Sequence, residues 1–190
     1  MNIFYLDRDP KTCAEMHVDK HVVKMIIEYA QLMSTAHRIL DGKQYIDLTA
    51  NGRKIKRWQM KEPRYENGLM KASHINHPSA VWTRYSRKNY VWLNRMWNYL
   101  LLEYTHRYGK RHACAKYMEF LYIWPENIPD REFTEPTPAM PDDCKIPNDS
   151  IGSYHKYYIE KKNHFANWKN REIPIWYVEG LKHNANLLVS

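Results

Sequence analysis

The chain has 190 residues, 44% of them apolar and 14% aromatic, and a formal net charge of +8. This length and composition predict one domain with a sizeable core, and the lack of an apolar run of about 18 residues excludes a membrane-spanning helix. The first residues do not resemble a secretory signal. Three widely separated cysteines form no Cys-x-x-Cys pair, so reduced thiols and a cytoplasmic location are expected.

The charge is unevenly distributed along the chain. Residues 53–116 contain 15 Lys and Arg against 3 Asp and Glu, a net +12, whereas residues 117–150 contain 2 against 8, a net −6. The basic block favours a nucleic acid partner, because each phosphate that a cation neutralises releases counterions. A solvated face that keeps the protein soluble is the alternative. The acidic block 117–150 is a candidate docking surface for a host protein.

Asp9 and Pro10 predict the N-cap and the first position of a long helix. This helix should run to about Leu40 and stop at Gly42. Its core side is an apolar stripe at helical spacing from Val18 onward.

Residues 43–77 are polar and strongly basic and show no clear periodicity. They predict a long loop with room for one short helix at about 53–61. Pro78 then opens a second long helix, over about 79–107, which Gly109 closes.

A short helix over about 112–122 precedes a segment with six prolines between Pro125 and Pro147, which exclude long regular structure. A further helix is predicted over about 149–168. Residues 173–177 then form an aromatic strap, and the last few residues are expected to fray.

These elements predict an all-α protein, a single compact helical domain with two long helices, a basic loop and a long Pro-rich loop. Its segments are the N-terminal segment and helix (1–42), the basic loop (43–77), the central helices (78–122), the Pro-rich loop (123–148), and the C-terminal helix with the aromatic strap (149–190).

A second stripe of the first predicted helix is polar and largely ionisable, and at 100° per residue its six side chains lie within about 80° of one another. Val23 and Ile27 make the far side of the helix apolar as well, so this stripe should border buried surface. Burial and neighbouring charges shift pKa values in the way that catalysis requires. A polar seam against another helix is the alternative. The six residues are His17, His21, Lys24, Glu28, Gln31 and Thr35.

The histidines at 17 and 21 also have the i,i+4 spacing of two metal ligands. No recognised ligand motif accompanies them, and ten histidines make chance pairs common. We therefore predict no metal and no cofactor, and a histidine-based metal-dependent hydrolase is the third functional alternative. Further ligands in that case would be Asp19, His74, His77 or His112.

Two regions are candidate nucleic-acid contacts. The second predicted helix carries Arg84, Lys88 and Arg95 on one side, with Arg87 close by, as a phosphate track. Near the C-terminus rings alternate with cations, so the rings can stack on unpaired bases while the cations bind phosphates. A strap that seals the core is the alternative. The residues of this second region are Trp168, Lys169, Arg171, Trp176 and Tyr177.

Four strings across most of the chain resemble a family of small phage proteins whose function is not characterised. They are His17-x-Asp19-Lys20-His21-Val22-Val23-Lys24-Met25, His77-Pro78-x-x-Val81-Trp82-x-Arg84, Glu103-Tyr104-x-x-Arg107-Tyr108-Gly109-Lys110-x-His112 and Ala139-Met140-Pro141-Asp142.

The order of elements also resembles, remotely, the pyrimidine-dimer DNA glycosylases of the phage endonuclease V type. The shared features are an extended N-terminal segment, a long helix with Ala14-x-x-His17, and a closing segment Trp168-Lys169-x-x-Arg171-x-x-Pro174-x-Trp176-Tyr177. The resemblance implies a helical enzyme in which an N-terminal amine attacks the sugar, a glutamate on the first helix assists, and the terminal aromatic segment touches DNA.

The chain departs from that pattern at two positions. The family exposes its amine by removing the initiator methionine, but Asn2 is large enough that Met1 should stay. The family's glutamate would fall between His21 and Lys24, where no carboxylate stands, and Glu28 lies one turn further on.

The leading hypothesis is a phage-type enzyme that acts on DNA, in preference to RNA, at a base or its glycosidic bond. Glu28 would be the carboxylate, and Lys24 or the Met1 amine the nucleophile, with His17 and His21 beside them. Asp142 and Lys145 of the Pro-rich loop would form a lid that supplies an acid. The alternative is a non-catalytic module that binds nucleic acid or a host protein.

Overall fold

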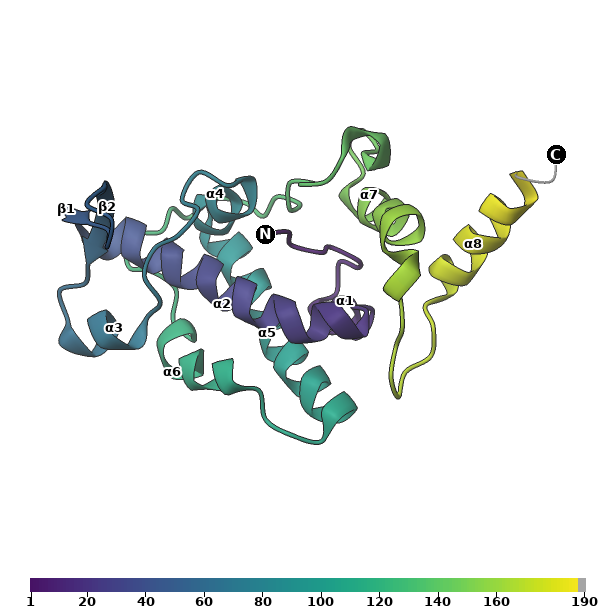
Figure 1. Ribbon diagram of the computed structural model, residues 1–190, viewed down its shortest axis with the longest axis horizontal. Helices are drawn as coiled ribbons and strands as arrows, with labels where there is room; N and C mark the ends of the chain where they lie inside the picture. The colour runs from purple at the N-terminus through teal and green to yellow at the C-terminus, as the bar shows by residue number, and fades with distance from the viewer. Residues whose placement is uncertain (188–190) are drawn as a thin grey trace.

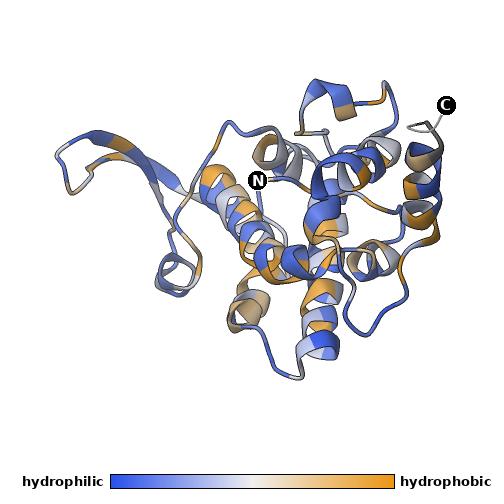
Figure 2. Cartoon of the chain, turned by 45° about the vertical axis from the view of Figure 1, so that its right-hand side comes forward, coloured by the Kyte–Doolittle hydropathy of each residue, from blue (hydrophilic) through white to orange (hydrophobic). Residues whose placement is uncertain are grey.

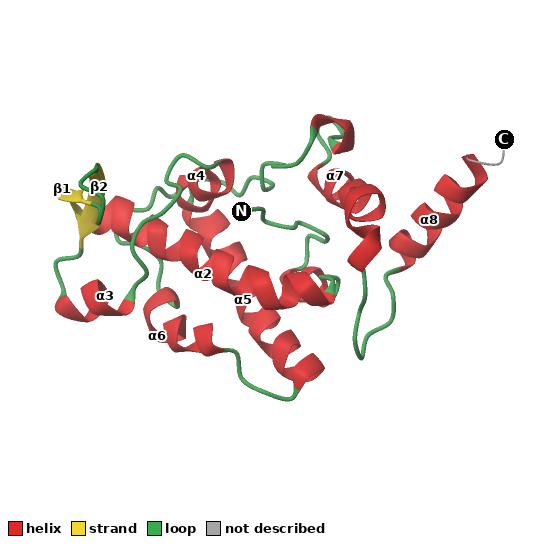
Figure 3. Cartoon of the chain, viewed as in Figure 1, coloured by secondary structure: helices red, strands yellow, loops and turns green. Residues whose placement is uncertain are grey.

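The computed structural model describes residues 1–187, and the chain is predominantly α-helical with one two-stranded antiparallel sheet (Figure 1, Figure 3). The helices are α1 (Pro10–Glu15), α2 (Asp19–Asp41), α3 (Pro63–Gly68), α4 (Pro78–Tyr85), α5 (Arg87–Tyr108), α6 (Met118–Leu121), α7 (Ser150–Tyr157) and α8 (Ile175–Leu187), and the strands are β1 (Lys43–Leu48) and β2 (Lys54–Gln59). The predicted all-α class is confirmed, with the small hairpin as an addition. The expected fraying of the last residues falls largely on 188–190, outside the described residues.

The two long helices, α2 and α5, cross at the centre of the molecule, and α1 and α4 pack against them (Figure 1). Their contact is apolar and nearly free of solvent, with Trp97 fully buried and its indole N–H donating to the carbonyl of Ile26 at 2.9 Å. A buried indole keeps its large apolar area out of water only if its N–H finds such an acceptor. None of the described helices is long and apolar enough to cross a membrane.

The first predicted helix begins as expected but is not continuous. The side chain of Asp9 accepts the N–H of Thr12 at 2.8 Å, the hydrogen bond of an N-cap. The helix then stops at Glu15 and restarts at Asp19.

Side chains from distant parts of the chain satisfy the carbonyl groups at this break. Arg107 donates to the carbonyls of Glu15 and His17, at 2.9 Å each, and the Trp168 indole donates to the carbonyl of Met16 at 2.8 Å. Helix ends leave carbonyl groups without partners, and a break is tolerated where donors replace the lost bonds. No proline or glycine marks this position, so the local sequence does not signal the break.

The second predicted helix is also divided in two. Ser86 has an extended backbone (φ −146°, ψ 152°), and its hydroxyl accepts the N–H of Asn89 at 3.0 Å, which caps α5. The N–H of Arg87 donates to the carbonyl of Pro129 at 2.8 Å. Gly109, with φ 66°, closes α5 as predicted.

The prediction of a loop with a short helix over the basic segment was wrong. Residues 43–59 form the β1–β2 hairpin, with six cross-strand pairs from Lys43↔Gln59 to Leu48↔Lys54, and α3 follows. Asn51-Gly52 in the turn, where Gly52 has φ 77°, was the available hairpin signal. Apolar residues do not alternate strictly with polar ones in either strand, so the sequence shows no clear strand pattern, and Trp58 is the only buried residue among the twelve.

The remaining elements follow the prediction more closely. The short helix near 112–122 is present as a 3₁₀ turn followed by α6, and the Pro-rich segment contains only a short 3₁₀ turn. The predicted helix over 149–168 is α7 followed by a π-helical turn and a 3₁₀ turn. The strap prediction holds only in part, because α8 begins at Ile175.

Candidate functional site

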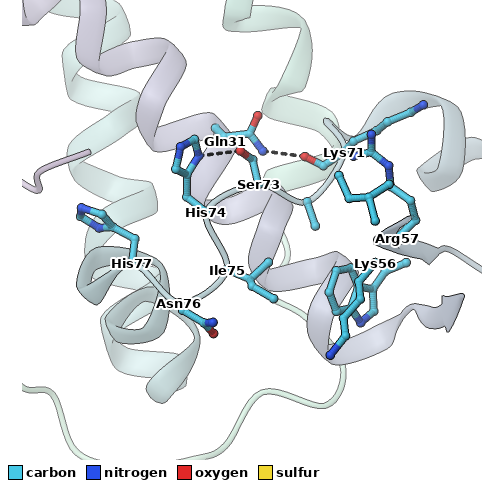
Figure 4. Close-up of a pocket in the computed structure, with 12 residues that line it drawn as sticks. Gln31, Lys56, Arg57, Lys71, Ser73, His74, Ile75, Asn76 and His77 are labelled. Carbon is cyan, nitrogen blue, oxygen red and sulfur yellow. Dashed lines mark hydrogen bonds between the residues drawn. The ribbon is translucent and has the colours of Figure 1, made fainter. Parts of the chain in front are cut away.

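A cleft lies between β2 and the segment that precedes α4, and we call it the hairpin cleft (Figure 4). Its volume is about 920 Å³. Helix α2 contributes one side chain, Gln31, to its wall. The lining residues are Gln31, Ile55–Trp58 and Lys71–His77.

The lining of the hairpin cleft is strongly cationic. It contains Lys56, Arg57 and Lys71 together with His74 and His77, and none of the lining residues is a carboxylate. Among these cations, Arg57 pairs with a carboxylate, but the distance is long: its Nε atom lies 3.8 Å from Asp47. A concave surface of one charge sign concentrates ligands of the opposite sign.

The buried side chain of Arg38 holds together the segments around the hairpin cleft. Its buried guanidinium donates five hydrogen bonds of 2.7–2.9 Å, to the carbonyls of Trp58, Glu66, Leu69 and Met70 and to the Glu66 carboxylate. One side chain thus ties the base of the hairpin and the chain after α3 to α2. Sequence analysis missed this residue, because an arginine near the end of a helix normally lies in solvent.

The segment before α4 is held by the C-terminal part of the predicted polar stripe. Gln31 donates to the carbonyl of Lys71 at 2.8 Å (Figure 4). The Thr35 hydroxyl accepts the N–H of Ser73 at 3.2 Å. His74 has a positive φ of 49°, and its ring lies 2.6 Å from the Ser73 hydroxyl. A non-glycine residue in this conformation costs free energy and is common at functional sites.

Glu28 lies one helical turn before Gln31 and is largely shielded, with a side chain that is 19% exposed. Two amino groups are close to its carboxylate: Lys24 at 3.4 Å and the amino group of Met1 at 3.9 Å. His77 of the cleft wall is near the same group. Burial lowers the pKa of His77, the Met1 amino group and His74 lower it further, and Glu28 opposes them. Glu28 therefore acts electrostatically on His77 in the cleft wall, although it does not itself line the hairpin cleft.

The two histidines of the predicted stripe are not beside Glu28. His17 is fully buried, and its ring nitrogens bond the carbonyl of Cys13 at 2.7 Å and the Tyr29 hydroxyl at 3.1 Å. His21 stacks on Phe4 with ring centroids 4.0 Å apart. The expected single stripe is therefore split, because the break before Asp19 turns His17 away and the N-terminal segment covers His21.

The Nδ1 atom of His21 is 2.7 Å from the Tyr158 hydroxyl. Burial lowers the pKa of His17 to about 4 and that of His21 to about 2, and the same cause lowers the pKa of His37 to about 4. These three rings are neutral members of the core at neutral pH.

We expect these buried histidines to make the fold acid-sensitive. Their pKa values in the folded chain lie below the ordinary value of 6.5. The unfolded chain therefore gains protons first as the pH falls, and stability is lost progressively below about pH 6.5. By pH 5 each ring should cost about 2 kcal/mol of unfolding free energy. Urea unfolding at a series of pH values measures this loss.

A matched pair of variants isolates one ring. His21→Phe should remove about 2 kcal/mol of the change between neutral pH and pH 5, whereas His164→Ala, at an exposed position, should leave the pH dependence unchanged. Stability that stays constant over this range would contradict the prediction.

The predicted lid residues pair with each other and not with Glu28. Asp142 is 94% exposed and pairs with Lys145 at 2.7 Å, and neither residue lines the hairpin cleft. Within the described chain, one cluster has its potential metal ligands within 4.8 Å of one another, formed by Asp143, Cys144 and Glu160. Lysines already pair with both of its carboxylates.

Two of the four cations in the predicted phosphate track, which lies on α4 and α5, pair with carboxylates of the chain itself. Lys88 pairs with Glu132 at 2.6 Å, and the neighbouring Arg87 pairs with Asp130 at 2.7 Å. Both acidic residues belong to the acidic block, which packs along α5. Arg84 is partly buried, and burial lowers its pKa. Arg95 is exposed and lines a smaller pocket beside Trp124.

The aromatic segment near the C-terminus packs into the core. Trp168 and Tyr177 are each 5% exposed and contact each other edge to face. Trp176 is half-buried and stacks on His155, with ring centroids 3.8 Å apart. These rings are engaged by the protein, so the alternative of a strap that seals the core describes their packing.

The two cations of this segment differ. Arg171 pairs with Glu103 at 2.7 Å and with Glu15 at 3.2 Å, so its charge is already neutralised within the protein. Lys169 is exposed, and its backbone N–H donates to Asp19. Of the eight residues predicted to bind nucleic acid, Lys88, Arg95 and Lys169 are exposed, and none of the eight lines the hairpin cleft.

The remaining metal candidates are also dispersed. Asp19 pairs with Arg107 at 2.8 Å, and His112 accepts the N–H of Cys114 at 3.1 Å. His74 and His77 share the cleft wall.

Comparison of the chain with protein-family models, with curated proteins and with solved structures finds no match.

Proposed function

We propose that this protein binds DNA and that the hairpin cleft holds the sugar–phosphate backbone. The observation that carries the proposal is the contrast between two basic surfaces. The cleft presents Lys56, Arg57 and Lys71 with no carboxylate among its lining residues. On α5, by contrast, Arg87 and Lys88 already pair with carboxylates of the acidic block. A polyanion gains most where cations have no close internal partner, because it does not have to displace one, and among the cleft cations Arg57 has only the long contact with Asp47.

The other groups of the cleft suit a nucleotide as well. Gln31 and Asn76 offer side-chain amides, and Ile55 and Ile75 offer apolar surface beside the cations. Amides can bond to base edges, whereas cations bind the phosphates and fix the register. DNA is favoured over RNA on the resemblance to the phage glycosylases.

Salt dependence tests the proposed site. Affinity for a short DNA duplex should fall steeply between low and physiological salt, and Lys56→Ala and Lys71→Ala should each lower the slope of log K against log salt by about 1. Fluorescence anisotropy of a labelled duplex measures both quantities.

The matched control is Lys88→Ala, whose cation already has Glu132 as a partner. This variant should change the slope less than either cleft variant. Wild-type protein that shows no binding at low salt, or a larger effect of Lys88→Ala than of Lys71→Ala, would contradict the proposal.

A second candidate function, chemistry at a glycosidic bond, is favoured by the surroundings of Glu28. This carboxylate is shielded, lies 3.4 Å from the Lys24 amine and opposes the lowering of the pKa of His77 in the cleft wall. A neutral amine can attack the C1′ carbon of the sugar, so that an N–C1′ bond forms and the bond to the base breaks. The base leaves with the electron pair of the broken bond, while Glu28 would accept the proton of the amine, pass it to the leaving base and stabilise the positive sugar. The Met1 amino group is the other nucleophile considered.

A further inference from the structure

The β1–β2 hairpin stands away from the helical body (Figure 2). Eleven of its twelve strand residues are exposed or half-buried. An isolated two-stranded ribbon is at best marginally stable in water, so its shape here requires support from its two ends.

Both ends of the ribbon are braced. At the base, Arg38 donates to the carbonyl of Trp58 at 2.9 Å, and a Cβ atom at Gly42 would lie 2.5 Å from the carbonyl oxygen of Arg38. At the tip, Thr49 and Arg53 bond each other through backbone and side chain at 2.9 and 3.0 Å. The ribbon is therefore a preformed projection and not a loose loop.

One face of the ribbon combines apolar and cationic side chains in directly opposed pairs. Ile46 pairs with Lys56 and Leu48 pairs with Lys54 across the strands. Ile46 is 58% exposed and Leu48 is 62% exposed. Exposed aliphatic side chains that gather on a projection mark a surface that another molecule covers.

The charge of the ribbon identifies the kind of molecule. Residues 43–59 contain five Lys and Arg against the single acid Asp47. The partner is therefore polyanionic and also offers small apolar groups. The major groove of DNA has both: phosphates along its rims, and thymine methyl groups on its floor.

We infer that the hairpin is a ribbon that enters the major groove of duplex DNA, with Ile46 and Leu48 against thymine methyl groups and Lys54 toward the phosphates or guanine edges. A two-stranded β-ribbon fits the width of this groove, about 12 Å. The inference rests on the proposed DNA binding and extends it, because it names intact duplex as the ligand. The hairpin cleft at the base of the ribbon then receives the adjoining backbone.

The test uses a ribbon variant that leaves the cleft intact. Leu48 and Lys54 are a cross-strand pair, and neither lines the hairpin cleft. The double variant Leu48→Thr/Lys54→Ala should lose about tenfold or more in affinity for an A·T-rich duplex. Its affinity for the matching single strand should change much less. Replacing thymine by deoxyuridine in the duplex should weaken wild-type binding and have a smaller effect on the variant.

Two controls separate this inference from the proposed function. Lys116→Ala removes an exposed cation outside the ribbon and should have a small effect on both ligands. Lys71→Ala, in the cleft, should weaken both duplex and single strand. If the ribbon variant binds duplex normally while Lys71→Ala does not, the ribbon inference is overturned and the cleft proposal stands. Equal losses of the ribbon variant on duplex and single strand also overturn it. Wild-type protein that binds neither DNA overturns both.

Discussion

Replacing Arg107 by Met is expected to lower the free energy of unfolding by about 3–5 kcal/mol, the usual cost of removing one partner of a buried ion pair. Arg107 has a fully buried side chain that contacts Glu103 and pairs with Asp19 at 2.8 Å. Without it, the buried Glu103 carboxylate keeps only Arg171, and the carbonyls at the α1–α2 break lose their donor. Urea denaturation measures the change.

The matched control for this variant is Arg64→Met. Arg64 pairs with Glu119 at the same distance, 2.8 Å, but both side chains are more than half exposed. Surface pairs of this kind contribute at most about 1 kcal/mol. A loss below about 1 kcal/mol for Arg107→Met, or equal losses for the two variants, would show that the buried network does not hold the break between α1 and α2.

Replacing Glu28 by Gln should lower the rate of base release by about 100-fold or more, if the second candidate function is right. The amide keeps the shape of the side chain but cannot accept a proton or stabilise a positive sugar. Affinity for DNA and the melting temperature should stay close to those of the wild type. The measurement is single-turnover formation of abasic sites in duplexes that carry damaged or modified bases.

The control for this variant is Glu160→Gln. Glu160 also pairs with a lysine four residues away, Lys156, at 3.8 Å, but it belongs to the turn after α7 and not to α2. This change should leave the rate unaltered. If Glu28→Gln lowers stability and leaves the rate intact, Glu28 is part of a polar seam, and the protein is a binding module. If the wild-type protein releases no base from any of these duplexes, the same conclusion follows.

Local chemistry was enough to predict the helical class and several element ends. The carboxylate of Asp9 caps the first helix, and Gly109 ends α5 in the left-handed conformation. These features depend on neighbours within a few residues, so the sequence near them contains the whole cause. The Asn51-Gly52 turn was equally local, but the exposed strands around it lack the alternation that would have identified a hairpin.

The candidate site was predicted only in part. All side chains of the predicted polar stripe except Lys24 are buried or partly buried, as expected for a stripe that borders the core. Lys24 and Glu28 form the expected i,i+4 pair. The prediction of a single stripe assumed one continuous helix from Pro10 to about Leu40. The break before Asp19 instead sends His17 into the core, and Phe4 covers His21. Lys24 and Glu28 remain an ion pair, next to the amino group of Met1.

The surfaces themselves were decided by contacts between residues far apart in the chain. The charge blocks were visible in the sequence, but Glu132 neutralises Lys88 across 44 residues, and Arg38 reaches 20–32 residues along the chain to build the cleft. Such pairs leave no periodic trace, because their free energy comes from burial and hydrogen bonding in the assembled fold. The sequence alone therefore shows which charged residues the protein carries and where they cluster along the chain. Tertiary packing determines which of these cations remain accessible to a ligand.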